Sequence, residues 1–253
     1  MPTNEPTIEQ LRKICQDRPD KHDFYMWGVA RKVSIYITWL AVRTPITPNQ
    51  ITLLSLLFGV AGAAFFASVS PVYWIVGWLV VNAHLILDQV DGEVAYYKKM
   101  LTKFGYFFDE ITHPIVNAAL FMAVAASAYY ASNNPNMLFL GMTFLYSALI
   151  LRAIGVYSDF ATNRMFKLKT ERREMPRSWI GRITSMPFGL GGYFHIFVAA
   201  AILDIFFTFT IGYGDFIVGS FRELFFVSAA IAMFLAVIGK MFNLRGKLKD
   251  SRI

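Results

Sequence analysis

The sequence predicts an all-α integral membrane protein with six transmembrane helices, because its composition is strongly apolar and its apolar stretches are long. Of the 253 residues, 56% are hydrophobic and only 16% are charged, and the mean hydropathy is +0.46. A water-soluble domain carries roughly a quarter charged residues, so an ordinary soluble enzyme and a disordered chain are excluded. The single cysteine, Cys15, also excludes an internal disulfide scaffold.

The first part of the chain is polar and then becomes amphipathic. Residues 1–23 lack the apolar core of a cleavable signal peptide. Residues 24–43 carry Arg31 and Lys32 near their centre, and each charge would cost about 3 kcal/mol in the middle of a bilayer. We therefore expect residues 24–43 to form an amphipathic helix on the cytoplasmic membrane surface. Residues 1–47 are the predicted cytoplasmic and juxtamembrane region.

Six apolar stretches follow, and each is long enough to cross a bilayer as a helix of about 20 residues. Thr47–Pro48 has the character of a helix start with a cap, and turn formers such as Pro71 separate the stretches. The predicted transmembrane domain covers residues 48–243, and a basic tail, residues 244–253, follows it. The predicted spans are residues 51–69, 71–91, 104–131, 136–161, 187–212 and 216–239.

The positions of the basic residues predict the topology. All but two of the 24 Lys and Arg residues fall in four segments, and the exceptions are Arg152 and Arg222. Because cytoplasmic loops collect cations, both termini are predicted to lie inside the cell. The net charge of +7 then reflects topology and attraction to anionic lipids, so no nucleic-acid partner is expected. The four segments are residues 1–47, 98–103, 164–182 and 240–252.

Acidic residues gather where the second span meets the third. Asp88 and Asp91 are spaced i, i+3, and Asp109 and His113 are spaced i, i+4, so each pair occupies one stripe of a helix. A short basic turn joins the two helices, which therefore run antiparallel with these stripes able to face each other. Carboxylates are costly within a membrane, and clustered oxygen ligands suit Mg²⁺, Mn²⁺ or Ca²⁺. The same spacing would also fit an alternative in which these acidic residues form a solvated rim at the membrane surface and bind no cation.

This region resembles the signature of the CDP-alcohol phosphotransferase (CDP-alcohol phosphatidyltransferase) family. The signature reads D-x2-D-G-x2-A-R, and after about eight residues G-x3-D-x3-D. In two positions the chain departs from it, since Tyr96 replaces the Arg and His113 replaces the last Asp. The opening of the first span and the six-helix plan with a surface helix are also similar to that family. The matching residues are Asp88, Asp91, Gly92, Ala95, Gly105 and Asp109, with Pro48, Asn49 and Thr52 at the opening of the first span.

The resemblance implies an enzyme that transfers a substituted phosphoryl group from a CDP-alcohol donor to an acceptor hydroxyl and releases CMP. It implies Mg²⁺ or Mn²⁺ held by Asp88, Asp91, Asp109 and His113, with Asp109 and His113 as catalytic residues. An imidazole at His113 can serve as base for the acceptor hydroxyl or as a nitrogen ligand. Phospholipid or related phosphodiester synthesis, a polyol, sugar or lipid acceptor, membrane lipids as partners, a homodimer and an active site on the cytoplasmic side are implied as well.

The resemblance also implies a binding site for the donor nucleotide. Because Tyr96 lacks the charge of the signature Arg, another cation has to take its place, and Lys98, Lys99, Lys103 and Arg152 are candidates. Among these, Lys103 and Arg152 are also expected contacts for the acceptor or a substrate phosphate. A catalytically inactive relative that binds nucleotide or lipid and a small membrane transporter are the alternative functions. The expected nucleotide-binding residues are Asn49, Thr52, Gly92, Ala95, Tyr96, Thr102 and Gly105.

Several polar residues within the predicted spans need partners there. Arg152 is expected to pair with a substrate group, Asp88 or Asp159. His84, one turn before Asp88, is expected to form a supporting hydrogen bond, and Asp204 a hydrogen bond between helices. Pro114 removes one helix hydrogen bond directly after His113, so the third predicted span is expected to bend there.

Overall fold

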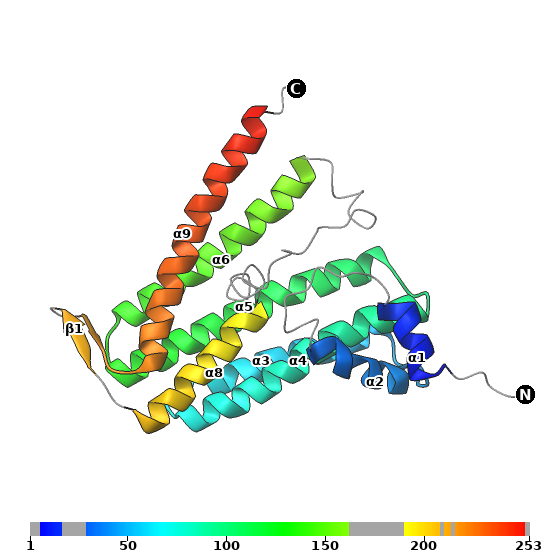
Figure 1. Cartoon of the computed structure of the whole chain (residues 1–253), viewed down its shortest axis with the longest axis horizontal. Helices are drawn as coiled ribbons and strands as arrows, with labels where there is room; N and C mark the ends of the chain where they lie inside the picture. Colours follow the sequence, from blue (N-terminus) through cyan, green and yellow to red (C-terminus); the bar gives the residue numbers. More distant parts are fainter. Residues whose placement is uncertain (1–5, 17–28, 162–189, 208–209, 214–215, 251–253) are drawn as a thin grey trace, which may run out of the picture.

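The computed structural model describes residues 6–16, 29–161, 190–207, 210–213 and 216–250, and helices dominate them (Figure 1). Three short helical elements come first, six longer helices follow, and a two-stranded antiparallel hairpin of β1 and β2 precedes the last helix. The elements are α1 (Ile8–Leu11), η1 (Arg12–Gln16), α2 (Arg31–Ala41), α3 (Pro48–Phe66), α4 (Pro71–Tyr97), α5 (Lys103–Ser132), α6 (Asn136–Ala161), α8 (Leu190–Phe206), β1 (Ile211–Tyr213), β2 (Phe216–Val218) and α9 (Phe221–Asp250).

Five of the described helices, α3, α4, α5, α6 and α9, are long and apolar enough to cross a membrane. The predicted all-α membrane fold is therefore confirmed, whereas six crossings and inside termini stay predictions. α8 has a shorter apolar stretch, His195–Phe206. Many large apolar side chains on these helices are exposed, as lipid-facing side chains are: Leu57, Leu79, Phe139 and Leu235 each expose more than half of their surface.

The predicted ends of the last two spans are wrong. α8 ends at Phe206 rather than at residue 212, and α9 begins at Phe221 rather than at residue 216. Residues 211–218 instead contain the hairpin, in which Ile211 pairs with Val218. Gly212 weakens a helix, and β-branched and aromatic residues around it favour short strands. At its other end α9 continues to Asp250, past the predicted domain boundary at residue 243.

The first long helix begins where the sequence predicts a cap. The Thr47 hydroxyl accepts a hydrogen bond from the Gln50 N–H (3.4 Å), and the Gln50 side chain accepts one from the Thr47 N–H (2.9 Å). Pro48 occupies the first helical position, where its missing N–H leaves no helix bond unmade. These local signals fix the start of α3.

The segment predicted as an N-terminal amphipathic helix forms α2 over Arg31–Ala41, and residues 24–28 lie outside the described residues. One face of α2 buries Ser34, Ile35 and Thr38, while Tyr36 and Leu40 on the other side are exposed. Arg31 is also buried. The position of α2 on a membrane surface stays a prediction.

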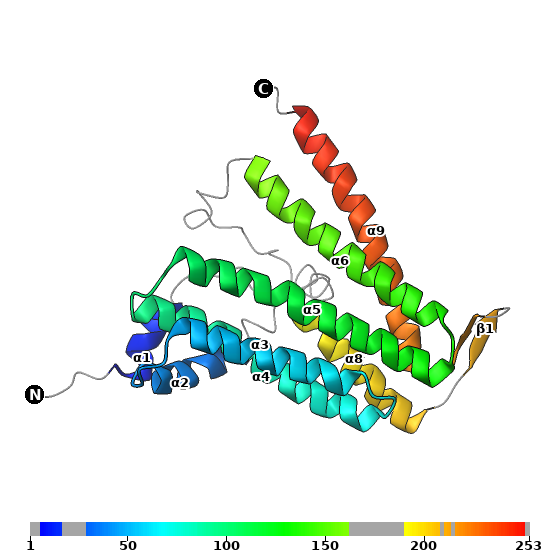
Figure 2. The ribbon, with the colours of Figure 1, turned by 180° about the vertical axis from the view of Figure 1, so that it is seen from behind.

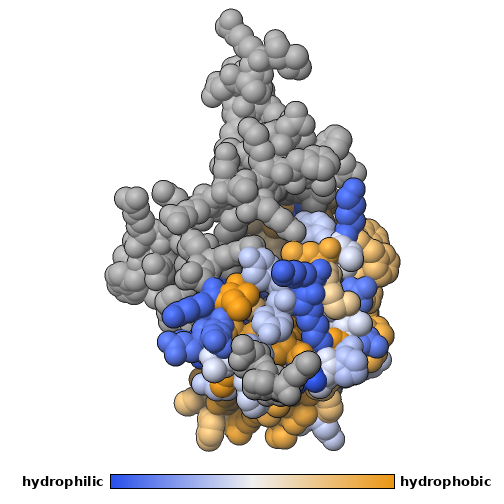
Figure 3. Space-filling view, turned by 90° about the vertical axis from the view of Figure 1, so that its right-hand side faces the viewer, coloured by the Kyte–Doolittle hydropathy of each residue, from blue (hydrophilic) through white to orange (hydrophobic). Residues whose placement is uncertain are grey.

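The helices lie as two groups (Figures 1 and 2). α3, α4 and α5 run side by side, whereas α6 and α9 pair with each other and diverge from α5 toward their C-terminal ends. The hairpin and the α5–α6 turn lie at one end, and α2 and the α4–α5 connection lie at the opposite end. Figure 3 views this second end, where hydrophilic residues gather among apolar ones.

An ion pair joins the helices near the hairpin. Arg222 of α9 lies 2.5 Å from Asp204 of α8 and also donates to the Val69 carbonyl (2.7 Å). The expected interhelical hydrogen bond of Asp204 is thus confirmed. This pair lies at the end of the bundle opposite to the acidic stripes. A substitution in it is therefore a suitable control for substitutions in the acidic stripes.

Candidate active site

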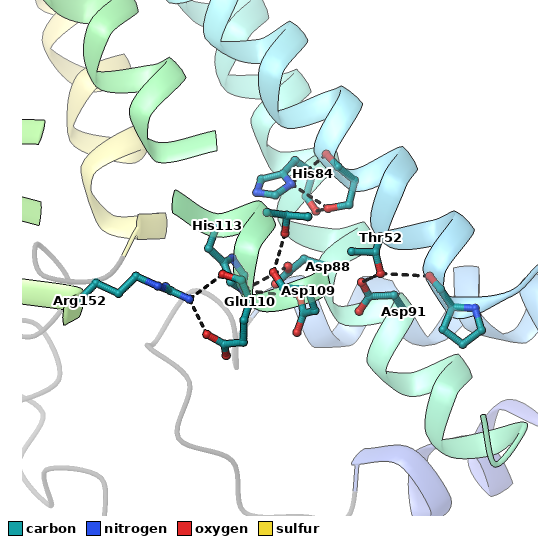
Figure 4. Close-up of polar contacts among 11 residues, drawn as sticks. Thr52, His84, Asp88, Asp91, Asp109, Glu110, His113 and Arg152 are labelled. Carbon is teal, nitrogen blue, oxygen red and sulfur yellow. Dashed lines mark hydrogen bonds and ion pairs between the residues drawn. The ribbon is translucent and has the colours of Figure 1, made fainter. Parts of the chain in front are cut away.

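Two antiparallel helices bring three of the predicted ligands together. Asp88 comes from α4, and Asp109 and His113 come from successive turns of α5 (Figure 4). His113 Nε2 lies 3.8 Å from Asp88 Oδ1 and 3.6 Å from Asp109 Oδ1. One ligand atom from each residue lies within 4.8 Å of the others. Because the helix period places residues 109 and 113 on one face, the predicted stripe is formed.

The three side chains fit a divalent cation. Asp109 Oδ1 is buried and accepts no hydrogen bond from the described residues. A buried carboxylate oxygen without a partner is costly, and a cation would satisfy it. Ligands of a six-coordinate Mg²⁺ at about 2.1 Å lie about 3 Å apart when adjacent and about 4.2 Å apart when opposite, and the two distances from His113 fall between these values. The mixed oxygen and nitrogen set also accepts Mn²⁺.

Asp91 lies one turn further along α4 and is buried. Its Oδ2 atom lies 2.6 Å from the Thr52 hydroxyl of α3, which also lies 3.1 Å from the Pro48 carbonyl oxygen. The structure therefore joins a predicted metal ligand to a predicted nucleotide-binding residue. Asp91 stands apart from the compact group of Asp88, Asp109 and His113, and its role as a fourth ligand stays a prediction.

His84 supports the same region from the apolar side. It is buried one turn before Asp88, and its Nδ1 atom lies 2.8 Å from the Ser55 hydroxyl oxygen and 3.0 Å from the Ser55 carbonyl oxygen. His84 therefore has a hydrogen-bond partner, but this partner is a residue of α3 and not a member of the acidic cluster, so the expected support of a metal ligand stays a prediction. This contact holds α4 against α3 just before the acidic stripe begins.

Three residues predicted to line the donor nucleotide meet at the start of α5. A Cβ atom at Gly105 would lie 3.0 Å from Thr102 Oγ1 and 3.1 Å from Asn49 Oδ1. Thr102 also caps α5, since its hydroxyl accepts the Gly105 N–H at 2.9 Å. A Cβ atom at Gly92 would have no heavy atom of the described residues within 4 Å, so this face of α4 is open. Ala95 is buried on the same helix.

Lys98, one of the basic candidates, has hydrogen-bond partners within the protein. Lys98 donates to the Thr44 carbonyl (2.7 Å) and to the Ile46 carbonyl (2.8 Å), so it holds the α2–α3 connection. Desolvation lowers the pKa of the Lys98 ammonium. Lys99 and Lys103 are exposed beside the start of α5. Their roles toward phosphate, and that of half-buried Tyr96, stay predictions.

Arg152 of α6 has a protein partner that the sequence did not indicate. Its Nη2 atom lies 2.9 Å from the Glu110 carbonyl oxygen and 2.5 Å from Glu110 Oε2 (Figure 4). The expected pairing with Asp88 is therefore wrong, and the Asp159 side chain lies outside the described residues. Glu110 is the residue after Asp109 and lies 42 positions from Arg152. To predict a pair this far apart in the sequence, one has to know which face of α6 packs against α5.

A second residue missed by the sequence analysis is Glu93, between Gly92 and Ala95 of the signature. It is buried, and its carboxylate accepts hydrogen bonds from Gln16 (2.6 Å), Ser34 (2.8 Å) and Thr38 (2.6 Å). The i, i+4 spacing of Ser34 and Thr38 on the amphipathic α2 was the one available signal. Glu93 thus anchors η1 and α2 beside the site.

A cavity of about 440 Å³ lies beside the Arg152–Glu110 pair, between α5, α6 and α9. Its lining is largely apolar, and its volume lies in the range of about 300–1,000 Å³ that is usual for ligand pockets. Asn117 Oδ1 is buried there and accepts no hydrogen bond from the described residues. The lining residues are Pro114, Asn117, Phe121, Leu145, Ala148, Leu149, Leu151, Arg152, Met233, Ala236 and Lys240.

The fold and the site define a multi-helix membrane protein with an acidic cluster at one end of its bundle. The sequence profile of the CDP-alcohol phosphatidyltransferase family matches residues 45–241, and the chain belongs to this family of transferases. The predicted family and enzyme class are thereby confirmed.

Known proteins similar to the chain agree with this assignment. A bifunctional IPC transferase and DIPP synthase of Aquifex aeolicus (strain VF5) is 37% identical over 102 residues, which cover 40% of this chain and 23% of that protein. The chain thus matches about a quarter of the length of this relative. Mycobacterium tuberculosis phosphatidylinositol phosphate synthase (PgsA1) with CDP-DAG bound has a TM-score of 0.58 and 16% identity, covering 84% of this chain and 94% of that one. The same enzyme in complex with manganese and citrate has a TM-score of 0.59 and 16% identity, covering 84% and 88%. At this identity the likeness establishes the fold.

Proposed function

We propose that this protein transfers a substituted phosphoryl group from a CDP-linked alcohol to an acceptor hydroxyl and releases CMP, in a reaction that depends on Mg²⁺ or Mn²⁺. The observation that carries the proposal is the convergence of Asp88, Asp109 and His113 within 4.8 Å at the point where the family signature lies. Family membership supports the reaction class. Phosphoryl transfer needs charge neutralisation more than covalent catalysis, and this cluster is suited to that task.

Each residue of the cluster has a defined task in this proposal. Asp88, Asp109 and His113 hold the cation, with Asp91 as the fourth ligand. When bound there, the cation neutralises charge on the phosphoryl group and on the departing CMP. His113 Nε2 is not within hydrogen-bonding distance of either carboxylate atom nearest to it, so it is available as ligand or as base for the acceptor hydroxyl. Asp109 lies one turn before His113 on the same face of α5, so both side chains can reach one cation.

We place the CDP group of the donor on the face that carries Gly92, Ala95 and Gly105. The open space beside Gly92 admits a ligand close to the helix backbone. Asn49, Thr52, Tyr96 and Thr102 complete this site with hydroxyl and amide groups. Of the two exposed lysines, we assign Lys103 to substrate phosphate, whereas a phosphate at Arg152 would have to displace the Glu110 carboxylate.

A CDP-linked lipid is the donor class that the comparisons favour, since one structural relative is described with CDP-DAG bound. The largely apolar cavity beside Arg152 is where we place a hydrocarbon part of a lipid substrate. A polyol, sugar or lipid hydroxyl then accepts the phosphoryl group, as in phospholipid or related phosphodiester synthesis. We further propose that the site opens to the cytoplasm and that the protein works as a homodimer in the membrane.

The test is CMP release by the purified protein in nanodiscs, offered a panel of CDP-alcohols, each with candidate hydroxyl acceptors. We expect release with one donor class, and only when Mg²⁺ or Mn²⁺ is present. Absence of release from every donor, together with measurable CDP binding, would favour the inactive relative and would make Tyr96 and His113 the residues to revert to Arg and Asp. If the protein were a transporter, it would instead move a solute across the membrane of liposomes. The membership of the chain in a transferase family does not favour this alternative.

A further inference from the structure

Pro114 leaves a main-chain group of α5 without its usual partner. In an α-helix the N–H of residue 114 would donate to the carbonyl of residue 110, but proline has no N–H. The part-buried Glu110 carbonyl is thereby left to accept a hydrogen bond from another donor, since main-chain carbonyls that are removed from water are nearly always paired. The turn that this missing bond would close, residues 110–114, contains His113 and directly follows Asp109. One member of the predicted cation site thus lies on the turn that lacks this bond, and a second lies directly before it.

Arg152 supplies the missing donor from the neighbouring helix. Its Nη2 group donates both to the Glu110 carbonyl (2.9 Å) and to the Glu110 carboxylate. One guanidinium therefore fixes the main chain and the side chain of the same residue, with its charge matched by Glu110 (Figure 4). α6 runs away from α5 toward its C-terminal end (Figures 1 and 2), and this contact is a polar link between the two diverging helices.

We propose that Arg152 is a positioning residue that replaces the helix hydrogen bond removed by Pro114 and so holds Asp109 and His113 at the spacing needed for the cation. Its catalytic consequence rests on the proposed transferase function, but the structural role does not. The signature position at Tyr96 suggested that Arg152 takes over a phosphate contact, whereas the observed contacts engage its guanidinium with Glu110. The guanidinium acts through α5 rather than on the substrate.

The test is a double-mutant cycle of Arg152→Met, Pro114→Ala and the two combined. Alanine restores the N–H that donates to Glu110, so it makes Arg152 dispensable for this turn. We expect Arg152→Met to lower kcat and Mn²⁺ affinity about 10–100-fold, as loss of a group that orients metal ligands does, with the KM of both substrates unchanged. Pro114→Ala in the Arg152→Met background should recover most of this loss. Amide hydrogen exchange in peptides covering residues 109–114 should rise in Arg152→Met and fall again in the double variant.

Lys240→Met is the matched control. Lys240 lines the same cavity but donates to the Leu151 carbonyl (3.2 Å), so Pro114→Ala should not recover any loss that it causes. If Arg152→Met does not fold, Arg152→Lys keeps a positively charged donor nitrogen without the planar guanidinium and gives a smaller effect of the same kind. A raised KM without recovery by Pro114→Ala would overturn the proposal, as would unchanged hydrogen exchange in Arg152→Met. If the wild-type protein releases no CMP, the transferase proposal fails, while Mn²⁺ affinity and hydrogen exchange still decide the role of Arg152.

Discussion

Asp109→Asn should stabilise the protein that holds no cation and destabilise the protein that has bound one. In the protein without cation, Asp88 and Asp109 present two carboxylates whose ligand atoms lie within 4.8 Å of each other. Asparagine keeps the shape of the side chain but removes one negative charge. The substitution therefore relieves repulsion in the cation-free protein and removes a ligand from the cation-bound one.

The magnitudes follow from this geometry. At 4.8 Å, the largest separation of these ligand atoms, and an effective dielectric constant of about 20, two unit charges repel by about 3.5 kcal/mol, which sets the scale of what Asp109→Asn relieves. In the wild type, a cation at about 100 times its Kd adds about 2.7 kcal/mol if it binds the folded state alone. For a domain of this size that raises Tm by about 5–11 °C. The variant should lose most of this rise.

The assay is thermal unfolding in detergent across a titration of Mg²⁺ or Mn²⁺. We expect cation-free Asp109→Asn to be at least as stable as the wild type and nearly insensitive to the cation. Asp204→Asn is the control, because Asp204 is also a buried carboxylate but pairs with Arg222 at the other end of the bundle. Breaking that buried pair costs about 3–5 kcal/mol, yet the cation-induced rise should remain. A full cation response in Asp109→Asn, or its loss in Asp204→Asn, would refute the site.

His113→Asp should raise the ratio of Mg²⁺-supported to Mn²⁺-supported CMP release, because Mg²⁺ prefers a carboxylate to an imidazole nitrogen; an unchanged ratio would count against His113 as a ligand. Glu93→Ala should lower Tm in unfolding scans, since it leaves the buried Thr38 hydroxyl without its acceptor at about 1–3 kcal/mol, while the Ser34 hydroxyl keeps the Arg31 carbonyl, and Glu93→Gln should lower Tm less. Burial, aided by the Glu93 charge, raises the pKa of the Cys15 thiol from 9.0 to about 11. Iodoacetamide labelling followed by mass spectrometry should therefore be slower for native than for unfolded protein at pH 8. Because the native state keeps a proton that the unfolded state loses, this group should also lower stability as pH rises from about 9 to about 11.

The sequence predicts the helices of this protein where local signals are strong. The capping residues before Pro48 fixed the start of α3, and α6 has the predicted range 136–161. The hairpin at residues 211–218 was missed, because short apolar strands next to an apolar helix have the same hydropathy as a longer span. Hydropathy reports burial in lipid, and it does not distinguish the two secondary structures at this length.

The acidic site was predictable because it depends on helix geometry. The i, i+4 spacing of Asp109 and His113 and the short connection to the helix of Asp88 suffice to bring the three together. The partners Glu110 and Glu93 were not predictable in the same way. They contact residues on other helices, Arg152 and Thr38, and their pairing depends on how helices distant in sequence pack. Pro114 gave the one local sign, since it marks the carbonyl that needs a new donor.

The most direct test of the proposed enzyme is a metal titration of CMP release with the preferred CDP-alcohol, comparing the wild type with Asp88→Asn and Asp204→Asn. The cation site predicts saturable activation by Mg²⁺ or Mn²⁺ in the wild type, loss of activity in Asp88→Asn, and an unchanged metal requirement in whatever fraction of Asp204→Asn remains folded. Release of CMP that persists without divalent cation, or that Asp88→Asn leaves intact, would contradict the assignment of Asp88, Asp109 and His113 as the centre of the reaction.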